Sequence, residues 1–296
     1  MGFKSGFVTV VGRPNVGKST LVNKIIDEKI AIMSDKPQTT RNRITAIHTS
    51  KTSQIIFLDT PGLHRPKNKL GEFMVKAAYD TVKDVDVVIF MVDESGSIGP
   101  SDKEIIENLQ GAKAPVILVI NKVDLIMPDK YARIVANYEK YDFIKEIISI
   151  SALENKNIDL LISKIEAHLD DGPMFYPEDM ITDQPERVIA AEIIREKLLH
   201  YLDEEVPHGV AVEIENMKKR KGQDMFDIRA TIICEKDSHK GIIIGKNGRK
   251  LKGIGKSSRE DIERLLGSKV FLELWVKVKQ GWRDNDSLLK NYGYKR

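Results

Sequence analysis

The sequence predicts two successive domains: an α/β domain around a mostly parallel six-stranded sheet, then a smaller α+β domain. At 296 residues the chain is longer than one hydrophobic core usually serves. From Phe7 to Leu169, short β-branched runs alternate with amphipathic stretches, which is typical of an α/β domain. Between Asp170 and Pro185 this pattern stops in a segment with three prolines and five acidic residues. We therefore expect domains at 1–170 and 186–296, joined by a linker at 171–185.

In the first domain, the β-branched runs are the expected strands and the amphipathic stretches the expected helices. The strands are expected at Phe7–Val11, Ile44–Thr49, Gln54–Leu58, Val87–Val92, Val116–Ile120 and Glu146–Ile150. The helices are expected at Lys18–Asp27, Gly71–Lys83, Asp102–Gln110, Lys130–Tyr141 and Ile158–Leu169.

The second domain shows a different order: a helix, two strands, two helices and a strand. The expected elements are Glu186–Leu202, Val210–Met217, Asp227–Glu235, a helix near Lys240–Ile244, Arg249–Leu266 and Val270–Lys279. The last strand alternates apolar and charged residues, which predicts one buried face.

Composition limits the compartment and the class of protein. The chain has 41% hydrophobic and 31% charged residues and a net charge of +3, as an ordinary globular protein has. Its single cysteine, Cys234, excludes an internal disulfide and favours the cytoplasm. No apolar run approaches the roughly 20 residues of a membrane-spanning helix. The first residues lack the pattern of a signal peptide or a myristoylation site, so we expect no anchor there.

The run GRPNVGKS, Gly12–Ser19, has the pattern of a phosphate-binding loop and lies between an expected strand and an expected helix. Glycines let backbone N–H groups surround the phosphates, and the helix N-terminus adds partial positive charge. Lys18 is expected to reach the outer phosphates, and the Ser19 hydroxyl is expected to bind Mg²⁺.

Two later segments complete the expected phosphate site. Asp59 of the run DTPG is expected near the Mg²⁺, and the Gly62 N–H near the terminal phosphate. The long connection 30–43 contains PQTTR, and it is a candidate mobile loop ordered by the terminal phosphate, with Thr40 as a further Mg²⁺ ligand. The alternative, a passive surface loop, does not explain its position.

The run NKVD, Asn121–Asp124, predicts that the base is guanine. Its aspartate can accept the ring N–H and the amine hydrogens of guanine, whereas adenine offers neither. Ser151–Ala152 is expected to present a backbone N–H to the guanine carbonyl. Together we expect nucleotide contacts from Gly12, Asn15, Val16, Gly17, Lys18, Ser19, Thr20, Asn121, Lys122, Asp124, Ser151, Ala152 and Leu153. Lys18, Thr40, Asp59 and Gly62 are expected to act in hydrolysis, and Ser19, Thr40 and Asp59 to bind the metal.

The motifs GRPNVGKS, QTTR, DTPG, NKVD and SA, in this order, resemble those of the Era family of GTPases. In Ras-type proteins a glutamine after the DTPG-equivalent glycine orients the attacking water, but here the residue is Leu63. We therefore expect slow hydrolysis of GTP to GDP, which either a partner or a K⁺ ion near Asn15 speeds up. The alternative for Asn15 is a side chain that only braces the loop.

In the second domain, Gly245–Gly248 forms a GxxG tetrad between two expected helices. The order of elements around it resembles the type II KH domain, in which this loop clamps single-stranded nucleic acid. The segment Lys236–Arg259 carries eight basic residues and one acidic residue, which suits phosphates. Bases are expected along the apolar groove near Ile242–Ile244. The expected RNA contacts are Ile243, Gly245, Lys246, Asn247, Gly248, Arg249 and Lys250.

The resemblance to the Era family covers nearly the whole chain. It implies a GTP-hydrolysing switch that binds the 3′ region of 16S ribosomal RNA and the 30S subunit during assembly, as a monomer. It also implies peripheral association with the inner face of the cell membrane. Two alternatives are a nonenzymatic RNA-binding protein that uses GTP as a structural ligand, and a small-molecule phosphotransferase. The second conflicts with Asp124 and leaves the KH-like half unexplained.

Overall fold

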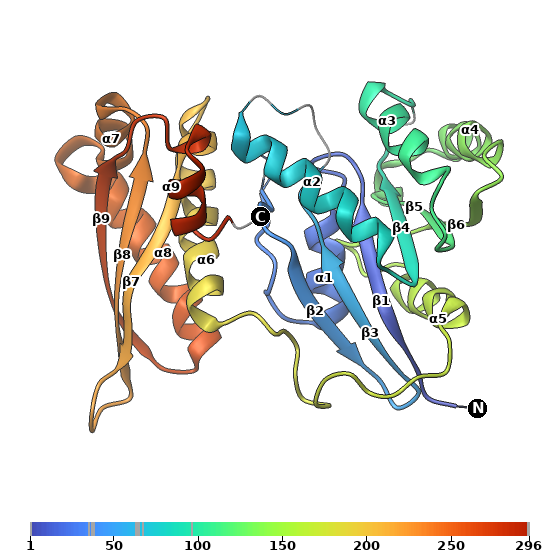
Figure 1. Cartoon of the computed structure of the whole chain (residues 1–296), viewed down its shortest axis with the longest axis horizontal. Helices are drawn as coiled ribbons and strands as arrows, with labels where there is room; N and C mark the ends of the chain where they lie inside the picture. Colours follow the sequence, from blue (N-terminus) through green and yellow to red (C-terminus); the bar gives the residue numbers. More distant parts are fainter. Residues whose placement is uncertain are drawn as a thin grey trace. The chain divides into compact units, whose positions relative to one another are not determined.

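The computed structural model describes residues 2–34, 36, 39–62, 66, 68–95 and 97–294. Figure 1 shows two units. The first contains the described residues up to Ala31, from Thr40 to Pro66 and from Gly71 to Asp183. The second contains the remaining described residues. None of the helices among the described residues is long and apolar enough to cross a membrane.

A six-stranded sheet in the order β2-β3-β1-β4-β5-β6 forms the centre of the first unit. Every pairing is parallel except that of β2 with β3, which confirms the mostly parallel sheet. The strands are β1 (Lys4–Val11), β2 (Ile44–Thr49), β3 (Ser53–Asp59), β4 (Val87–Val92), β5 (Val116–Ile120) and β6 (Ile144–Ser149). The central strands are almost continuously buried, as parallel strands covered on both faces are.

Five α-helices in the described residues of the chain's first part cover this sheet. They are α1 (Lys18–Ile26), α2 (Lys69–Lys83), α3 (Pro100–Leu109), α4 (Pro128–Glu139) and α5 (Ile158–His168), with a short 3₁₀ turn, η1 (Val123–Leu125). Residues of α1 and α5 share one core cluster with one face of the strands. Residues of α2, α3 and α4 share a second cluster with the other face. The carboxyl ends of β1, β3, β4 and β5 therefore all carry loops to one edge, where α/β proteins bind ligands.

The expected linker is held against the first unit along most of its length. Residue Asp171 pairs with Lys4, and the Gln54 side chain bonds the backbone of Phe175 and Tyr176. Further along, the backbone N–H of Ile47 in edge strand β2 donates to the Ile181 carbonyl at 2.9 Å. The segment is irregular, as its prolines predict, and yet it is fixed. The domain boundary itself stays a prediction.

The second unit has the predicted order of elements around a three-stranded sheet, β7-β8-β9. The elements are α6 (Glu186–Tyr201), η2 (Val206–Gly209), β7 (Ala211–Lys219), β8 (Met225–Cys234), α7 (Asp237–Ile244), η3 (Lys246–Gly248), α8 (Arg249–Leu266), β9 (Lys269–Val278), η4 (Trp282–Asp284) and α9 (Asp286–Asn291). Strand β8 pairs antiparallel with β7 and parallel with β9. Helices α6, α7 and α8 contribute to one core with the sheet. The sequence did not predict α9, which is only six residues long.

The aromatic tail packs on its own unit. Trp282 is fully buried and its indole N–H donates to the Gly209 carbonyl at 3.0 Å. The rings of Tyr292 and Tyr294 contact it at centroid distances of 5.7 and 6.0 Å. The tail is therefore part of the core of its own unit. Cys234 is also a buried core residue.

Candidate functional site

The phosphate loop lies between β1 and α1, and two of its glycines are required by close contacts. A Cβ on Gly12 would lie 2.4 Å from the Met91 carbonyl oxygen. Gly17 has a φ of 103°, and a Cβ there would lie 2.3 Å from Nδ2 of Asn121. No other residue fits either position without displacing backbone or Asn121. Asn15 is exposed and left-handed with a φ of 67°, and Thr20 is half-buried in the first turn of α1.

Lys18 is buried within this loop. Its ammonium donates to the carbonyl oxygens of Gly12 at 3.1 Å and Arg13 at 2.8 Å. Burial lowers the pKa of Lys18 to about 8, against the opposing charge of Asp59. A phosphate group in the loop would offer this ammonium a stronger, charged partner than two carbonyls.

The three predicted metal ligands lie together. Ser19 Oγ is 3.0 Å from Thr40 Oγ1, and both hydroxyls donate to Oδ2 of Asp59, at 2.9 and 3.1 Å. Burial raises the pKa of Asp59, although the Lys18 charge and these bonds lower it. Its Oδ1 is buried and has no hydrogen-bond partner among the residues that the structure describes. Two hydroxyls and a carboxylate oxygen that needs a partner fit Mg²⁺, which prefers oxygen ligands.

The Gly62 backbone lies against the phosphate loop, because a Cβ there would be 3.1 Å from the Pro14 nitrogen. The Thr60 hydroxyl anchors this segment by donating to the Val10 carbonyl at 3.0 Å. Gly62 thus lies beside the phosphate loop, and its contact with a terminal phosphate stays a prediction. Leu63, Pro37 and Gln38, on which the hydrolysis and mobile-loop predictions partly rest, lie outside the described residues.

Asn121 acts as a link between loops. Its Nδ2 donates to the Val16 carbonyl at 2.8 Å, and its Oδ1 accepts the Ala152 N–H at 3.0 Å. Asn121 therefore holds the phosphate loop and the Ser151–Ala152 loop in place. The expected contact of Asn121 with the nucleotide stays a prediction.

Asp124 lies in η1 with its side chain exposed, which leaves the carboxylate open to a base. Val16, Ser151 and Ala152 are buried. The Ala152 N–H donates to Asn121, and the Ser151 N–H donates to the Lys156 carbonyl at 3.2 Å, so both N–H groups expected to meet the guanine carbonyl have protein acceptors in this structure. Leu153 is 76% exposed beside them, where an apolar side chain can cover a base.

The GxxG loop joins α7 and α8 through backbone angles that favour glycine. Gly245 has a φ of 70° with ψ of 174°, and Gly248 has a φ of 72°. A Cβ on Gly245 would lie 2.7 Å from that of Lys250, whereas nothing lies within 4 Å of one on Gly248. Gly248 is therefore open to an approaching backbone. Lys246, Asn247 and Arg249 are exposed around the loop, and Lys250 is half-buried.

A groove of about 430 Å³ opens beside this loop, between α8 and β9. Its lining residues are Gly248, Leu251, Lys252, Gly255, Lys256, Arg259, Leu272 and Leu274. It has an apolar floor and a basic wall, as expected of a single-stranded RNA site.

One expected RNA contact is wrong. Ile243 has 0% exposure and packs in the core, so its side chain cannot meet a base, while Ile242 is exposed. The groove residues Lys252, Lys256 and Arg259 were not predicted as contacts. Their helical spacing of four and three residues on one face of α8 was a signal that could have found them.

The sheet order, the phosphate loop with its hydroxyl–carboxylate cluster and the open Asp124 define a P-loop GTPase, and the second unit has the architecture of a KH domain. Two family models match the chain accordingly. One, described as a 50S ribosome-binding GTPase, covers residues 7–122, and a KH domain model covers residues 205–283.

The chain belongs to the GTPase Era family. The GTPase Era of Alkaliphilus oremlandii is 64% identical over 294 residues, which is 99% of this chain and 100% of the relative. A crystal structure of Era in complex with MgGDPNP and nucleotides 1506–1542 of 16S ribosomal RNA is 42% identical, with a TM-score of 0.95 and coverage of 99% and 100%. A variant of Aquifex aeolicus Era bound to GDP·AlF₄⁻ has the same identity, TM-score and coverage. The chain is therefore a GTPase, and the nonenzymatic alternative is set aside.

Proposed function

We propose that this protein is a GTP-driven switch that grips the 3′ region of 16S ribosomal RNA during assembly of the 30S subunit. One observation carries the proposal: a complete nucleotide site and an open GxxG loop beside a basic groove occur in the same chain. The relative with a TM-score of 0.95 holds MgGDPNP and 16S nucleotides together, which supports the same pair of ligands here. Binding to the 30S subunit during its assembly implies a cytoplasmic location for this protein.

The residues of the site divide the work on GTP. Lys18 and the backbone N–H groups of the phosphate loop would bind the β- and γ-phosphates. Ser19, Thr40 and Asp59 would hold Mg²⁺, which neutralises charge on those phosphates when bound. Thr40 and Gly62 would lie next to the terminal phosphate, so the loops that contain them would respond when that phosphate is lost.

On the RNA side, the GxxG loop would let the sugar–phosphate backbone approach, while bases would enter the groove over Leu272 and Leu274. Lys246, Arg249 and Lys250 would pair with phosphates.

GTP turnover and RNA binding test the proposal together. Turnover is measured with GTP and with ATP, each with and without a single-stranded RNA of the 16S 3′ end. GTP is expected to be hydrolysed and ATP left intact, with Lys18→Ala inactive and Gly248→Asp defective only in RNA binding. Absence of GTP turnover under every condition would refute the switch, and equal affinity for an unrelated RNA would refute the 16S site.

We also propose that K⁺ near Asn15 speeds hydrolysis, since Leu63 has no side-chain amide that could orient the attacking water. The exposed, left-handed Asn15 supports this reading. Turnover is expected to be faster in K⁺ than in Na⁺, and Asn15→Ala is expected to abolish the difference. Equal rates of hydrolysis in the two salts would exclude a role for K⁺. Peripheral association with the inner face of the membrane stays a prediction of the family.

A further inference from the structure

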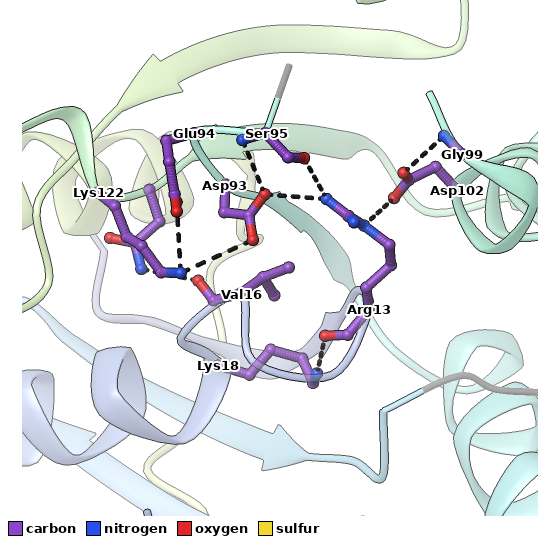
Figure 2. A network of polar contacts seen from close by, with 10 residues as sticks. Arg13, Val16, Lys18, Asp93, Glu94, Ser95, Gly99, Asp102 and Lys122 are labelled. Carbon is purple, nitrogen blue, oxygen red and sulfur yellow. Dashed lines mark hydrogen bonds and ion pairs between the residues drawn. The ribbon is translucent and has the colours of Figure 1, made fainter. Parts of the chain in front are cut away.

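Arg13 belongs to the phosphate loop, yet its side chain points away from the loop (Figure 2). Its Nη2 lies 2.9 Å from Oδ1 of Asp93 and donates to the Ser95 hydroxyl at 2.7 Å. Its Nε lies 2.9 Å from Oδ1 of Asp102. The guanidinium thus joins the phosphate loop to the end of β4 and to the first turn of α3.

Asp102 makes one end of this network rigid. It is fully buried, and its Oδ2 accepts the Gly99 backbone N–H at 3.1 Å at the start of α3. Among the described residues, Arg13 is the cation that pairs with it. Leaving a buried carboxylate without its cationic partner is strongly destabilising, so the position of Arg13 is tightly fixed.

Asp93 makes the connection to the guanine loop. Its Oδ2 lies 3.7 Å from the Lys122 ammonium, which also lies 3.3 Å from Oε2 of Glu94. Lys122 has a left-handed φ of 59° and stands two residues before Asp124. One carboxylate therefore contacts the phosphate loop through Arg13 and the base-reading loop through Lys122 (Figure 2).

This connection is separate from the one through Asn121, which runs from the Val16 carbonyl to the Ala152 N–H. It also reaches the phosphate-binding cation, because the Arg13 carbonyl oxygen accepts from Lys18 at 2.8 Å. A shift of Arg13 would move a partner of Lys18 directly.

We propose that Arg13 and Asp93 are positioning residues that hold the phosphate loop and the guanine loop at the spacing a guanine nucleotide requires. The proposal builds on the GTPase activity of the chain. GDP and GTP share the base and the inner phosphates, so loss of the contact between Arg13 and Asp93 would weaken the binding of both nucleotides. It would act mainly on nucleotide release, while hydrolysis of GTP once bound would continue.

The test measures release of a fluorescent GDP by stopped flow, together with kcat and KM for GTP, in Arg13→Met, Asp93→Asn and the double variant. Lys103→Met, an exposed lysine on α3, is the matched control. We expect release to be at least ten-fold faster and KM to rise in each single variant, with kcat within two-fold. The double variant is expected to be no worse than the more severe single one, because both remove the same link.

Thermal unfolding separates positioning from a fold defect. Asp93→Asn keeps the size of the side chain, so this variant is expected to fold, and Arg13→Lys provides a second folded test if Arg13→Met does not. Unchanged release in folded variants would overturn the proposal. A kcat that falls as far as KM rises would assign Arg13 to the chemical step instead, and additive effects would mean that the two residues act separately.

Discussion

At the scale of single residues, we expect Asp124 to decide which base the site accepts. Asn121 is engaged by Val16 and Ala152, whereas the Asp124 carboxylate is exposed. Discrimination should therefore follow the acceptor pattern of this one side chain.

Asp124→Asn is expected to weaken the binding of GTP and to favour the binding of xanthosine triphosphate. The amide presents a donor where guanine also has a donor, but xanthine has a carbonyl oxygen there. The variant loses one of the two acceptor oxygens and places its amide NH₂ opposite the guanine amine. This should cost about 3 kcal/mol, or roughly 100-fold in GTP affinity. Competition between the two nucleotides in turnover measures this. An unchanged preference for GTP would show that other groups choose the base.

Thr40 tests the metal cluster. Thr40→Ala removes one of the two hydroxyls on Asp59, so GDPNP binding should need about ten-fold more Mg²⁺, equivalent to about 1.4 kcal/mol. Thr40→Ser keeps the hydroxyl and should need the same Mg²⁺ as the parent. GDP binding should not change in either variant, since the proposed contact forms only with the terminal phosphate. A Thr40→Ala effect on GDP as large as that on GDPNP would contradict this.

Several site residues were predictable because their signal is local. Gly12–Ser19, Asp59–Gly62 and Asn121–Asp124 each follow a β-branched run, and parallel strands bring their loops to one edge of the sheet. The Arg13 network was not predictable. Its partners lie about 80 and 90 positions further along the chain, and nothing near Arg13 in sequence indicates which carboxylates will meet it. The prediction that Ile243 contacts RNA was wrong for a related reason, because three consecutive isoleucines do not reveal which one faces the core.

At the scale of secondary-structure elements, the boundaries depend on pairing as much as on propensity. Strand β1 begins at Lys4, earlier than its apolar run, because its first residues pair with β3. Helix α7 begins at Asp237, whose side chain suits the first turn of a helix. Strands β2, β4 and β5 have the predicted bounds. Strands β4 and β5 are buried at every residue, and β2 is buried over its first four residues.

The turn between α7 and α8 offers a matched pair of glycine substitutions. Gly245 has backbone angles almost confined to glycine and no room for a Cβ, so Gly245→Ala should cost about 3 kcal/mol and reduce RNA affinity. Gly248 has an ordinary left-handed conformation with open space, so Gly248→Ala should cost about 1 kcal/mol. Thermal unfolding and RNA titration measure both. Equal effects would mean that the Gly245 angles are not needed.

At the scale of the whole molecule, a switch requires that the nucleotide and RNA sites influence each other. If GDPNP in place of GDP strengthens RNA binding, then RNA must strengthen GDPNP binding relative to GDP by the same factor. We expect a factor of about 5 to 150, which is the usual range of coupling between two sites. Titrating RNA with each nucleotide, and each nucleotide with and without RNA, measures both factors. A factor of one in both directions would leave two independent activities.

The segment after α5 has a consequence for aggregation. Strand β2 is an outer strand of the six-stranded sheet, and outer strands invite pairing with other chains. The Ile47 N–H donates to Ile181, and the Thr182 hydroxyl donates to the Thr45 carbonyl, so the chain shields its own outer strand. A GTPase domain shortened at residue 170 should therefore self-associate, whereas one that ends at residue 183 should stay monomeric.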